Sequence, residues 1–185
     1  MRPETLYQKL DRRELGAHQL AESILGDADL LRAAVDGLYS KNPRVNYPCV
    51  KALRIVSRAH PRLVYPYFNS LVDLLRTSPL LIQNQTIFIL ANLARVDTQN
   101  KLEYFLDAYF VPLQGPNLLT AKSVVKGAVR LLAAKPELKD QIAGELLRVQ
   151  KGKYENKECR RIIYQDVLDA IQTMQSRPQT AGMVA

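Results

Sequence analysis

The chain has 185 residues, of which 47% are hydrophobic, and it carries a formal net charge of +8. This apolar content is sufficient for a continuous core and excludes a wholly disordered chain. No apolar run approaches the roughly 20 residues that a membrane-spanning helix requires, and the charged N-terminal stretch lacks the apolar segment of a secretory signal. We therefore expect a soluble, cytoplasmic protein without a membrane partner.

Two cysteines, Cys49 and Cys159, each lie within a stretch of helical periodicity. Free cysteine is among the residue types that are most often buried, and disulfides are rare in the cytosol. We therefore predict two free thiols that are buried or half-buried.

Residues 4–25 show the apolar stripe of an amphipathic helix among many charged residues. Gly16 weakens the middle of this stretch, so two shorter helices are the alternative. The mixed charge of the stretch suits a helix that covers the end of a larger helical array. We therefore assign residues 1–26 as an N-terminal capping helix.

The rest of the chain has apolar residues at spacings of three and four, and nothing in it has the period of a strand. Eight further helices are expected in four antiparallel pairs. The pairs are 29–39 with 44–59, 62–76 with 80–95, 98–113 with 118–134, and 137–150 with 155–175. Residues 176–185 lack periodicity and are predicted to form a flexible tail.

Local signals refine the ends of these helices. Asp27 and Thr98 are the expected N-caps, because short polar side chains accept hydrogen bonds from the first turn of a helix. The helix that follows Pro43 is expected to begin at about residue 44 or 47, and Asn46 is the candidate cap for the later start. Pro66 is expected to bend or delay the helix that follows Pro61.

Turn-forming prolines recur at a regular interval. Pro43, Pro79 and Pro116 each open the second helix of a pair, and they lie 36 and 37 residues apart. A fixed period of this size is typical of stacked helical repeats, in which one pair cannot bury its apolar face alone but stacked neighbours can. The stretch 80–95 is apolar nearly all round, which predicts a buried helix.

The turns and the ends of the second helices resemble those of HEAT repeats, which belong to the armadillo-like α-solenoids. The turn dipeptides are Asn42-Pro43, Ser78-Pro79 and Gly115-Pro116, and the helix ends are ALRIVSRA (52–59), ILANLAR (89–95) and AVRLLAAK (128–135). The resemblance covers residues 27–175. Members commonly have Asp in the turn and Arg early in the second helix, so this chain resembles a divergent member.

This resemblance implies an all-α, right-handed superhelix of about four helix pairs, preceded by the capping helix. It also implies that the second helices line the concave side, and that the protein binds or scaffolds partners rather than catalysing a reaction. Some HEAT-like proteins, the alkylpurine DNA glycosylases among them, act on DNA, which keeps a DNA-repair role as an alternative.

Charge is unevenly distributed between the first and second helices of the pairs. The second helices 44–59, 80–95 and 118–134 contain eight basic residues and no Asp or Glu, whereas the composition of the chain predicts about five acidic residues there. The expected concave side is therefore positive, with a neutral polar centre on the middle helix.

The residues predicted to bind a partner are cations in two stripes and two amides between them. They are Lys51, Arg54, Arg58, Gln85, Asn92, Lys122, Lys126 and Arg130. The first three recur at i, i+3 and i+7 and the last three at i, i+4 and i+8, so each trio shares one helix face. The cations would attract an anionic partner, and the amides would provide directional hydrogen bonds.

Three interpretations of this surface remain open. An acidic protein or peptide is the preferred partner. Nucleic acid is the alternative, because basic stripes are its electrostatic footprint, although few aromatic residues lie among the cations. The third interpretation is an ordinary solvated face that only keeps the protein soluble.

The sequence contains no recognised catalytic or phosphate-binding motif. His18 and His60 are expected at the surface or at a helix end, and no CxxC or HxxxH spacing supports a metal site. Asp166 and Asp169 share one helix face, for which a solvated face is preferred over a general-base site. We therefore predict a non-enzymatic protein with no catalytic residue, metal or cofactor.

Overall fold

The computed structural model describes residues 3–176, in which every regular element is an α-helix or a 3-10 helix. The predicted tail lies outside these residues, except for Ser176. Backbone contacts divide the chain into two compact units, Met1–Lys101 and Leu102–Ala185, which are described one at a time. None of the helices in the described part is both long and apolar enough to cross a membrane.

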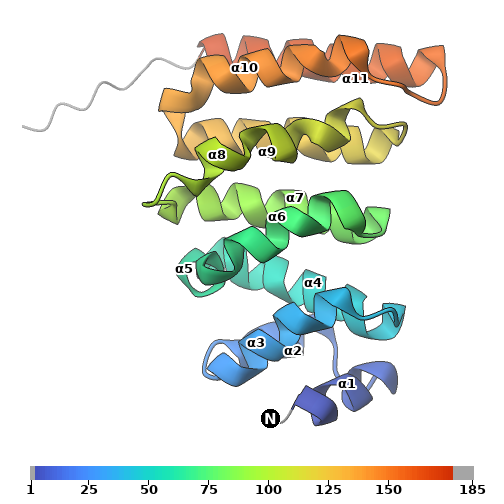
Figure 1. Ribbon diagram of the computed structural model, residues 1–185, viewed down its shortest axis with the longest axis vertical. Coiled ribbons are helices and arrows are strands. Elements are labelled where there is room, and N and C mark those ends of the chain that lie inside the picture. Colours follow the sequence, from blue (N-terminus) through green and yellow to red (C-terminus); the bar gives the residue numbers. More distant parts are fainter. Residues whose placement is uncertain (1–2, 177–185) are drawn as a thin grey trace, which may run out of the picture. The chain divides into compact units, whose positions relative to one another are not determined.

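Unit 1 is built from helices that follow one another closely along the chain (Figure 1). They are α1 (Pro3–Asp11), α2 (Ala17–Ile24), α3 (Ala28–Asp36), η1 (Gly37–Tyr39), α4 (Pro43–Ala59), α5 (Pro61–Val64), η2 (Tyr65–Tyr67), α6 (Phe68–Thr77), α7 (Leu80–Leu93) and η3 (Ala94–Val96). The expected all-α class is confirmed.

The N-terminal stretch forms two helices, which is the alternative that Gly16 suggested. Helix α1 ends in a Schellman motif. The Glu14 amide donates to the Lys9 carbonyl at 2.8 Å, and the Arg13 amide donates to the Leu10 carbonyl at 3.0 Å. Arg13 adopts a φ of 60°, the left-handed conformation that this type of helix end requires. Gly16 is the N-cap of α2.

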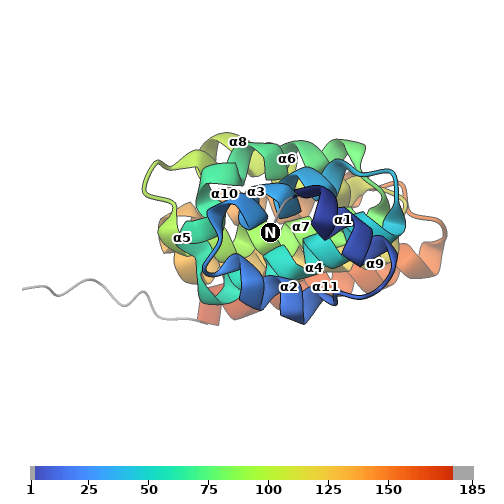
Figure 2. The ribbon, with the colours of Figure 1, turned by 90° about the horizontal axis from the view of Figure 1, so that it is seen from below.

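The helices of unit 1 pack mainly on their neighbours in sequence. Helix α4 contacts α2 on one side and α7 on the other, while α6 packs against α7 and α3 against α4. Figure 2 shows α3 and α6 on one side of this unit and α2 and α4 on the other. The core lies between these rows, where one face of each amphipathic helix is buried.

Helix α4 begins one turn earlier than a cap at Asn46 would place it. The side chain of Asn42 caps the helix by accepting a hydrogen bond from the Arg44 amide at 2.9 Å, and Pro43 occupies the first helical position. Asn46 is buried instead, and its amide donates to the Ser40 carbonyl at 2.8 Å. Of the two expected starts, the earlier one near residue 44 is confirmed, and the candidate cap at Asn46 was wrong.

The expected break at Pro66 is confirmed. The stretch after Pro61 divides into the short helix α5, the 3-10 turn η2, which contains Pro66, and the regular helix α6. Proline lacks the amide hydrogen that a continuous α-helix would use at this position, so the backbone tightens into a 3-10 turn.

Unit 2 follows the same all-helical pattern. Its elements are most of α8 (Lys101–Phe110), then η4 (Val111–Gln114), α9 (Leu118–Ala134), η5 (Pro136–Leu138), α10 (Lys139–Leu147), η6 (Arg148–Lys151) and α11 (Lys157–Ser176). Helix α9 packs against α11, and α10 contacts both. Asn117 caps α9 through a 3.0 Å hydrogen bond from the Thr120 amide, and the bounds of α9 match the prediction.

Helix α8 begins at Lys101, later than a cap at Thr98 would place it. The Asp97 carboxylate accepts hydrogen bonds from the Lys101 amide at 2.9 Å and from the Tyr65 hydroxyl at 2.6 Å. Burial and the neighbouring carboxylate together raise the pKa of Tyr65 to about 12. The carboxylate, only 3% exposed, thus ties the end of η3 to η2.

Both cysteines are free, as predicted, with Cys49 buried in α4 and Cys159 half-exposed in α11. The prediction of a buried helix at 80–95 is confirmed for the second half of α7, where nearly every side chain is buried, whereas Leu80 is exposed and most of the first half is half-buried.

Candidate binding surface

The eight predicted binding residues are distributed over both units. Lys51, Arg54 and Arg58 belong to α4 and Gln85 and Asn92 to α7, all in unit 1, while Lys122, Lys126 and Arg130 belong to α9 in unit 2. The site is therefore described for each unit separately.

The three cations of α4 share the face of this helix that points away from the core. Lys51 and Arg58 are exposed and Arg54 is half-buried, whereas Leu53 and Val56, on the opposite side, are buried. Neither α4 nor α7 contains an acidic residue. The three cations therefore have no acidic neighbour within α4 or α7.

Arg54 is held in a fixed orientation by two residues of α7. Its Nη1 donates a 2.7 Å hydrogen bond to Oε1 of Gln85, and its Cζ lies 4.2 Å from the centre of the Phe88 ring. A guanidinium that stacks on an aromatic face and bonds an amide has lost most of its rotational freedom. The Gln85 carbonyl is consequently engaged with Arg54 and serves to position that cation.

Asn92 lies inside the molecule, in the interface between α4 and α7. It is only 8% exposed, and its amide nitrogen donates to Oγ of Ser57 at 3.0 Å. The Ser57 hydroxyl in turn donates to the Arg54 carbonyl at 2.9 Å. The structure therefore corrects the expectation that Asn92 presents its amide at the surface.

Arg95 is a residue of this region that was not included among the predicted binding residues. Its Nη2 donates a 2.7 Å hydrogen bond to the carbonyl of Arg58, in the last turn of α4. A cation at a helix C-terminus satisfies an orphan carbonyl and suits the negative end of the helix dipole. Arg95 follows Arg58 by 37 residues, so the repeat spacing was the signal that could have found the pair.

In unit 2 the stripe of α9 is partly neutralised. Lys122 forms a salt bridge with Asp166 of α11, in which Nζ and Oδ2 are 3.0 Å apart. Lys126 and Arg130 are exposed. Helix α11, the second helix of the last pair, carries acidic residues and packs against α9. The surface of α9 is therefore less positive than expected.

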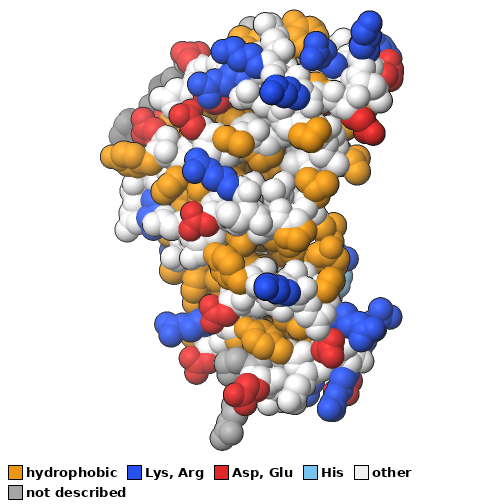
Figure 3. Space-filling model, turned by 45° about the vertical axis from the view of Figure 1, so that its right-hand side comes forward, with side chains coloured by type: hydrophobic (Ala, Val, Ile, Leu, Met, Phe, Trp, Pro, Cys, Tyr) orange, Lys and Arg blue, Asp and Glu red, His pale blue; other side chains and the backbone are white. Residues whose placement is uncertain are grey.

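A second group of cations, outside the predicted site, surrounds an open pocket of about 420 Å³ between η6 and α11. Lys157, Arg160, Arg161 and Tyr164 line it. Figure 3 shows Lys and Arg side chains gathered near this end of unit 2. The clustering of basic residues after residue 150 was a visible signal in the sequence.

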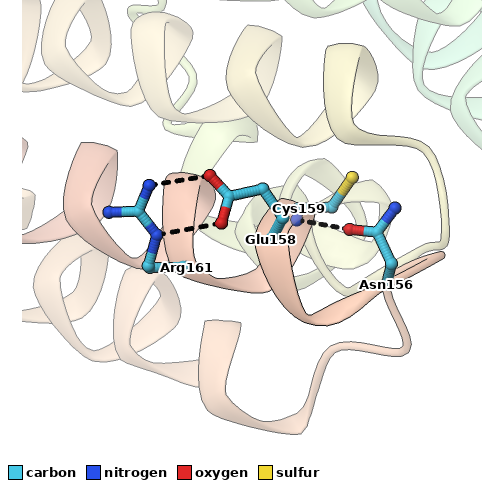
Figure 4. Close-up of polar contacts among 4 residues, drawn as sticks. All are labelled: Asn156, Glu158, Cys159 and Arg161. Carbon is cyan, nitrogen blue, oxygen red and sulfur yellow. Dashed lines mark hydrogen bonds and ion pairs between the residues drawn. The ribbon is translucent and has the colours of Figure 1, made fainter.

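The charge of this pocket is reduced by its own neighbours (Figure 4). Arg161 forms two hydrogen bonds with Glu158, at 3.1 and 2.7 Å, which lower the pKa of that carboxylate. Arg160 donates to the Gly152 carbonyl at 3.2 Å, and Asn156 caps α11 by accepting from the Cys159 amide at 2.8 Å. These contacts secure the start of α11.

The acidic pair of α11 makes polar contacts with two neighbouring side chains. Asp166 pairs with Lys122, and Asp169 accepts a 2.8 Å hydrogen bond from Gln165 one turn earlier on the same helix. Within residues 3–176, no three His, Cys, Asp or Glu side chains come close enough to hold a metal ion. The polar contacts of both carboxylates are those of a helix surface.

Comparison of the chain with models of known protein families and with curated proteins finds no match.

Proposed function

We propose that this chain is a HEAT-like repeat protein without enzymatic activity, and that it binds an acidic protein or peptide segment on the face of α4 that carries Lys51, Arg54 and Arg58. Lys126 and Arg130 of α9 offer a similar positive surface in unit 2. Separate observations support the repeat architecture and the acidic partner.

The repeat architecture is supported by the pattern of buried residues in the second helices. Shifting the numbering of α4 by 37 residues, and then that of α7 by 38, carries buried positions onto buried positions. The three matching sets are Val45, Val50, Leu53 and Val56; Ile82, Ile87, Leu90 and Leu93; and Thr120, Val125, Ala128 and Leu131. Repeats that stack in register are expected to bury equivalent positions in this way.

The acidic partner is supported by one observation above all, the fixed orientation of Arg54 in a face of α4 and α7 that has no carboxylate of its own. A planar guanidinium that is already positioned loses little entropy when it binds a carboxylate, and charge-assisted hydrogen bonds are stronger than neutral ones. Lys51 and Arg58 would add attraction on either side of it.

A peptide is favoured over nucleic acid because few aromatic rings lie among the cations of this face, where Tyr47 is half-buried. Phe88 is only 9% exposed, and Arg54 lies over it. Proteins that bind single strands typically expose aromatic rings among their cations, whereas carboxylate recognition needs the cations alone. Phosphate binding by the same cations is the alternative that the test must separate.

The test measures binding of a fluorescent acidic nonapeptide, made of Glu and Ser, to the full chain at about 50 mM salt. The variant Lys51→Glu with Arg58→Glu should lose at least about tenfold in affinity, because two attractive contacts become repulsive. The matched control is Arg32→Glu with Arg76→Glu on α3 and α6, which makes the same change in net charge at two exposed positions. Arg76, like Arg58, lies in the last turn of its helix.

The control should lose less than about threefold, because long-range charge effects are screened over roughly 10 Å in salt. Equal losses of peptide affinity in the two variants would contradict the proposed site. A labelled DNA duplex and single strand, measured at about 50 and 200 mM salt, form the second arm. Tight binding of DNA that is lost steeply with salt, together with no binding of the peptide, would assign the surface to nucleic acid instead.

A further inference from the structure

An open pocket of about 410 Å³ lies at the N-terminal end of α4. Its lining is largely apolar and includes Leu10, Leu15, Pro43 and Pro48. The pocket forms where the turn between α1 and α2 passes over the first turns of α4. It is lined entirely by residues of unit 1.

This pocket continues the basic stripe of α4. Tyr47, which also lines it, lies one helical turn before Lys51, and Arg54 and Arg58 follow on the same face at helical spacing. A peptide that lies along the stripe and extends toward the start of α4 would therefore reach the pocket. The apolar site and the basic site belong to one helix face.

The rim of the pocket is positive. Arg13 and Arg44 both line it and both are exposed. Arg44 lies 3.9 Å from Asp11 across an exposed salt bridge, a contact that contributes little and can be exchanged for a carboxylate of a partner. Arg13 occupies a position with a φ of 60°, where glycine would be the less strained residue.

An apolar pocket with a charged rim is the usual form of an anchor site, in which one buried side chain supplies most of the affinity and the surrounding charges select the partner. From this charge complementarity we infer that the pocket receives one apolar side chain, of the size of leucine, from an acidic peptide whose carboxylates pair with Arg13, Arg44 and the stripe of α4. The inference rests on the proposed function and adds the specificity that charge alone lacks.

The experiment compares two fluorescent nonapeptides of Glu and Ser that differ only at the central residue, which is leucine in one and serine in the other. The unmodified full chain should bind the leucine peptide about tenfold or more tightly, because burial of a leucine side chain is worth at least that factor. The serine peptide reports the attraction of the stripe alone.

A variant with a larger side chain in the lining of the pocket provides the second measurement. Gly16 lines the pocket with an ordinary φ of −90°, and a Cβ there would meet only Oε1 of Gln19, at 3.6 Å. Gly16→Leu should therefore fold and should remove the preference for leucine, while the serine peptide keeps its affinity. Gly26→Leu is the matched control, since a Cβ at Gly26 meets nothing within 4 Å and Gly26 is not part of the pocket.

Each outcome separates the pocket from the proposed function. If the unmodified chain binds both peptides equally, or if Gly16→Leu keeps the preference for leucine, the pocket is not an anchor site although the basic stripe still binds. If neither peptide binds, the proposed function fails and the anchor fails with it. Loss of the preference in Gly26→Leu as well as in Gly16→Leu would also overturn the inference.

Discussion

Gly37, the first residue of η1, packs so closely against its neighbours that no side chain fits there. A Cβ at this position would lie 2.7 Å from Sγ of Cys49 and 3.3 Å from Cε1 of Tyr7. Cys49 is fully buried in α4, and the Tyr7 ring is fixed by a 2.9 Å hydrogen bond from its hydroxyl to the Ala33 carbonyl. Neither neighbour can move away at low cost.

We therefore expect Gly37→Ala to lower the free energy of unfolding by about 1–3 kcal/mol, the usual cost of an overpacked core. Urea denaturation of the purified variant measures this loss. Gly26→Ala is the control and should be neutral or slightly stabilising, since its Cβ would meet no atom within 4 Å. Equal stability of the two variants would show that the packing around Gly37 can relax.

Residue-level prediction worked where it depended on helical spacing and failed where it depended on tertiary contacts. The spacing of Lys51, Arg54 and Arg58 was sufficient to place them on one face of α4. Nothing in the sequence indicated that Gln85 would hold Arg54 or that Asn92 would be buried. A helix that is apolar nearly all round also buries its few polar residues, and that rule was the available signal for Asn92.

At the scale of helices, the interface of α4 with α7 contains a buried polar link that takes no part in the proposed binding. The Asn92 amide donates to Ser57, and the Ser57 hydroxyl donates to the carbonyl of Arg54. A buried donor that loses its partner bears its full cost of desolvation, so the link should stabilise the pair of helices.

Asn92→Ala should therefore lower the free energy of unfolding by about 1–3 kcal/mol while leaving the affinity for the acidic peptide unchanged. Urea denaturation and peptide titration of the same sample measure both quantities. Combination with Ser57→Ala in a double-mutant cycle should give a coupling energy of about 1 kcal/mol. A loss of peptide affinity without a loss of stability would show that Asn92 takes part in binding.

The bounds of the helices were predictable where the signals were unambiguous. The turn Gly115-Pro116 followed by an uninterrupted apolar pattern predicted α9, and Pro66 predicted the break before α6. The start of α4 was ambiguous because two asparagines, Asn42 and Asn46, lie four residues apart near prolines. Only the three-dimensional position of Ser40, which engages Asn46, decides between them.

At the scale of the whole molecule, buried groups that ionise at high pH make the fold sensitive to base. Burial raises the pKa of Cys49 to about 12 from 9.0, and it raises the pKa of Tyr154 to about 12 from 10.0. The pKa of Tyr65 is raised to about 12 as well. Each group keeps its proton in the folded state at a pH where the unfolded chain has lost it.

Stability should therefore fall as the pH rises from about 9 toward 12, because the unfolded state then binds fewer protons than the folded state. Cys49 alone contributes at most about 1.4 kcal/mol per pH unit in this window. The urea midpoint at pH 7, 9 and 10.5 measures the slope, and Cys49→Ala should make it shallower. A midpoint that stays constant over this range would contradict the prediction.

Charge at this scale was the least predictable property of the candidate site. Counting residues by helix correctly identified α4 and α7 as free of acidic residues. The same count could not show that Asp166, which lies 44 residues after Lys122, would neutralise it. Salt bridges between helices depend on how the helices pack, which helical periodicity alone does not specify.

The hydrogen bonds between helices have a consequence for how the chain folds during its synthesis. In unit 1 they join positions such as Tyr7 and Ala33, which are 26 residues apart, and Arg58 and Arg95, which are 37 residues apart. Contacts of short sequence separation form quickly, because little chain entropy is lost in closing the loop between them. Since a ribosome adds about 5–20 residues per second, α1 to α4 can pack before α11 has been translated.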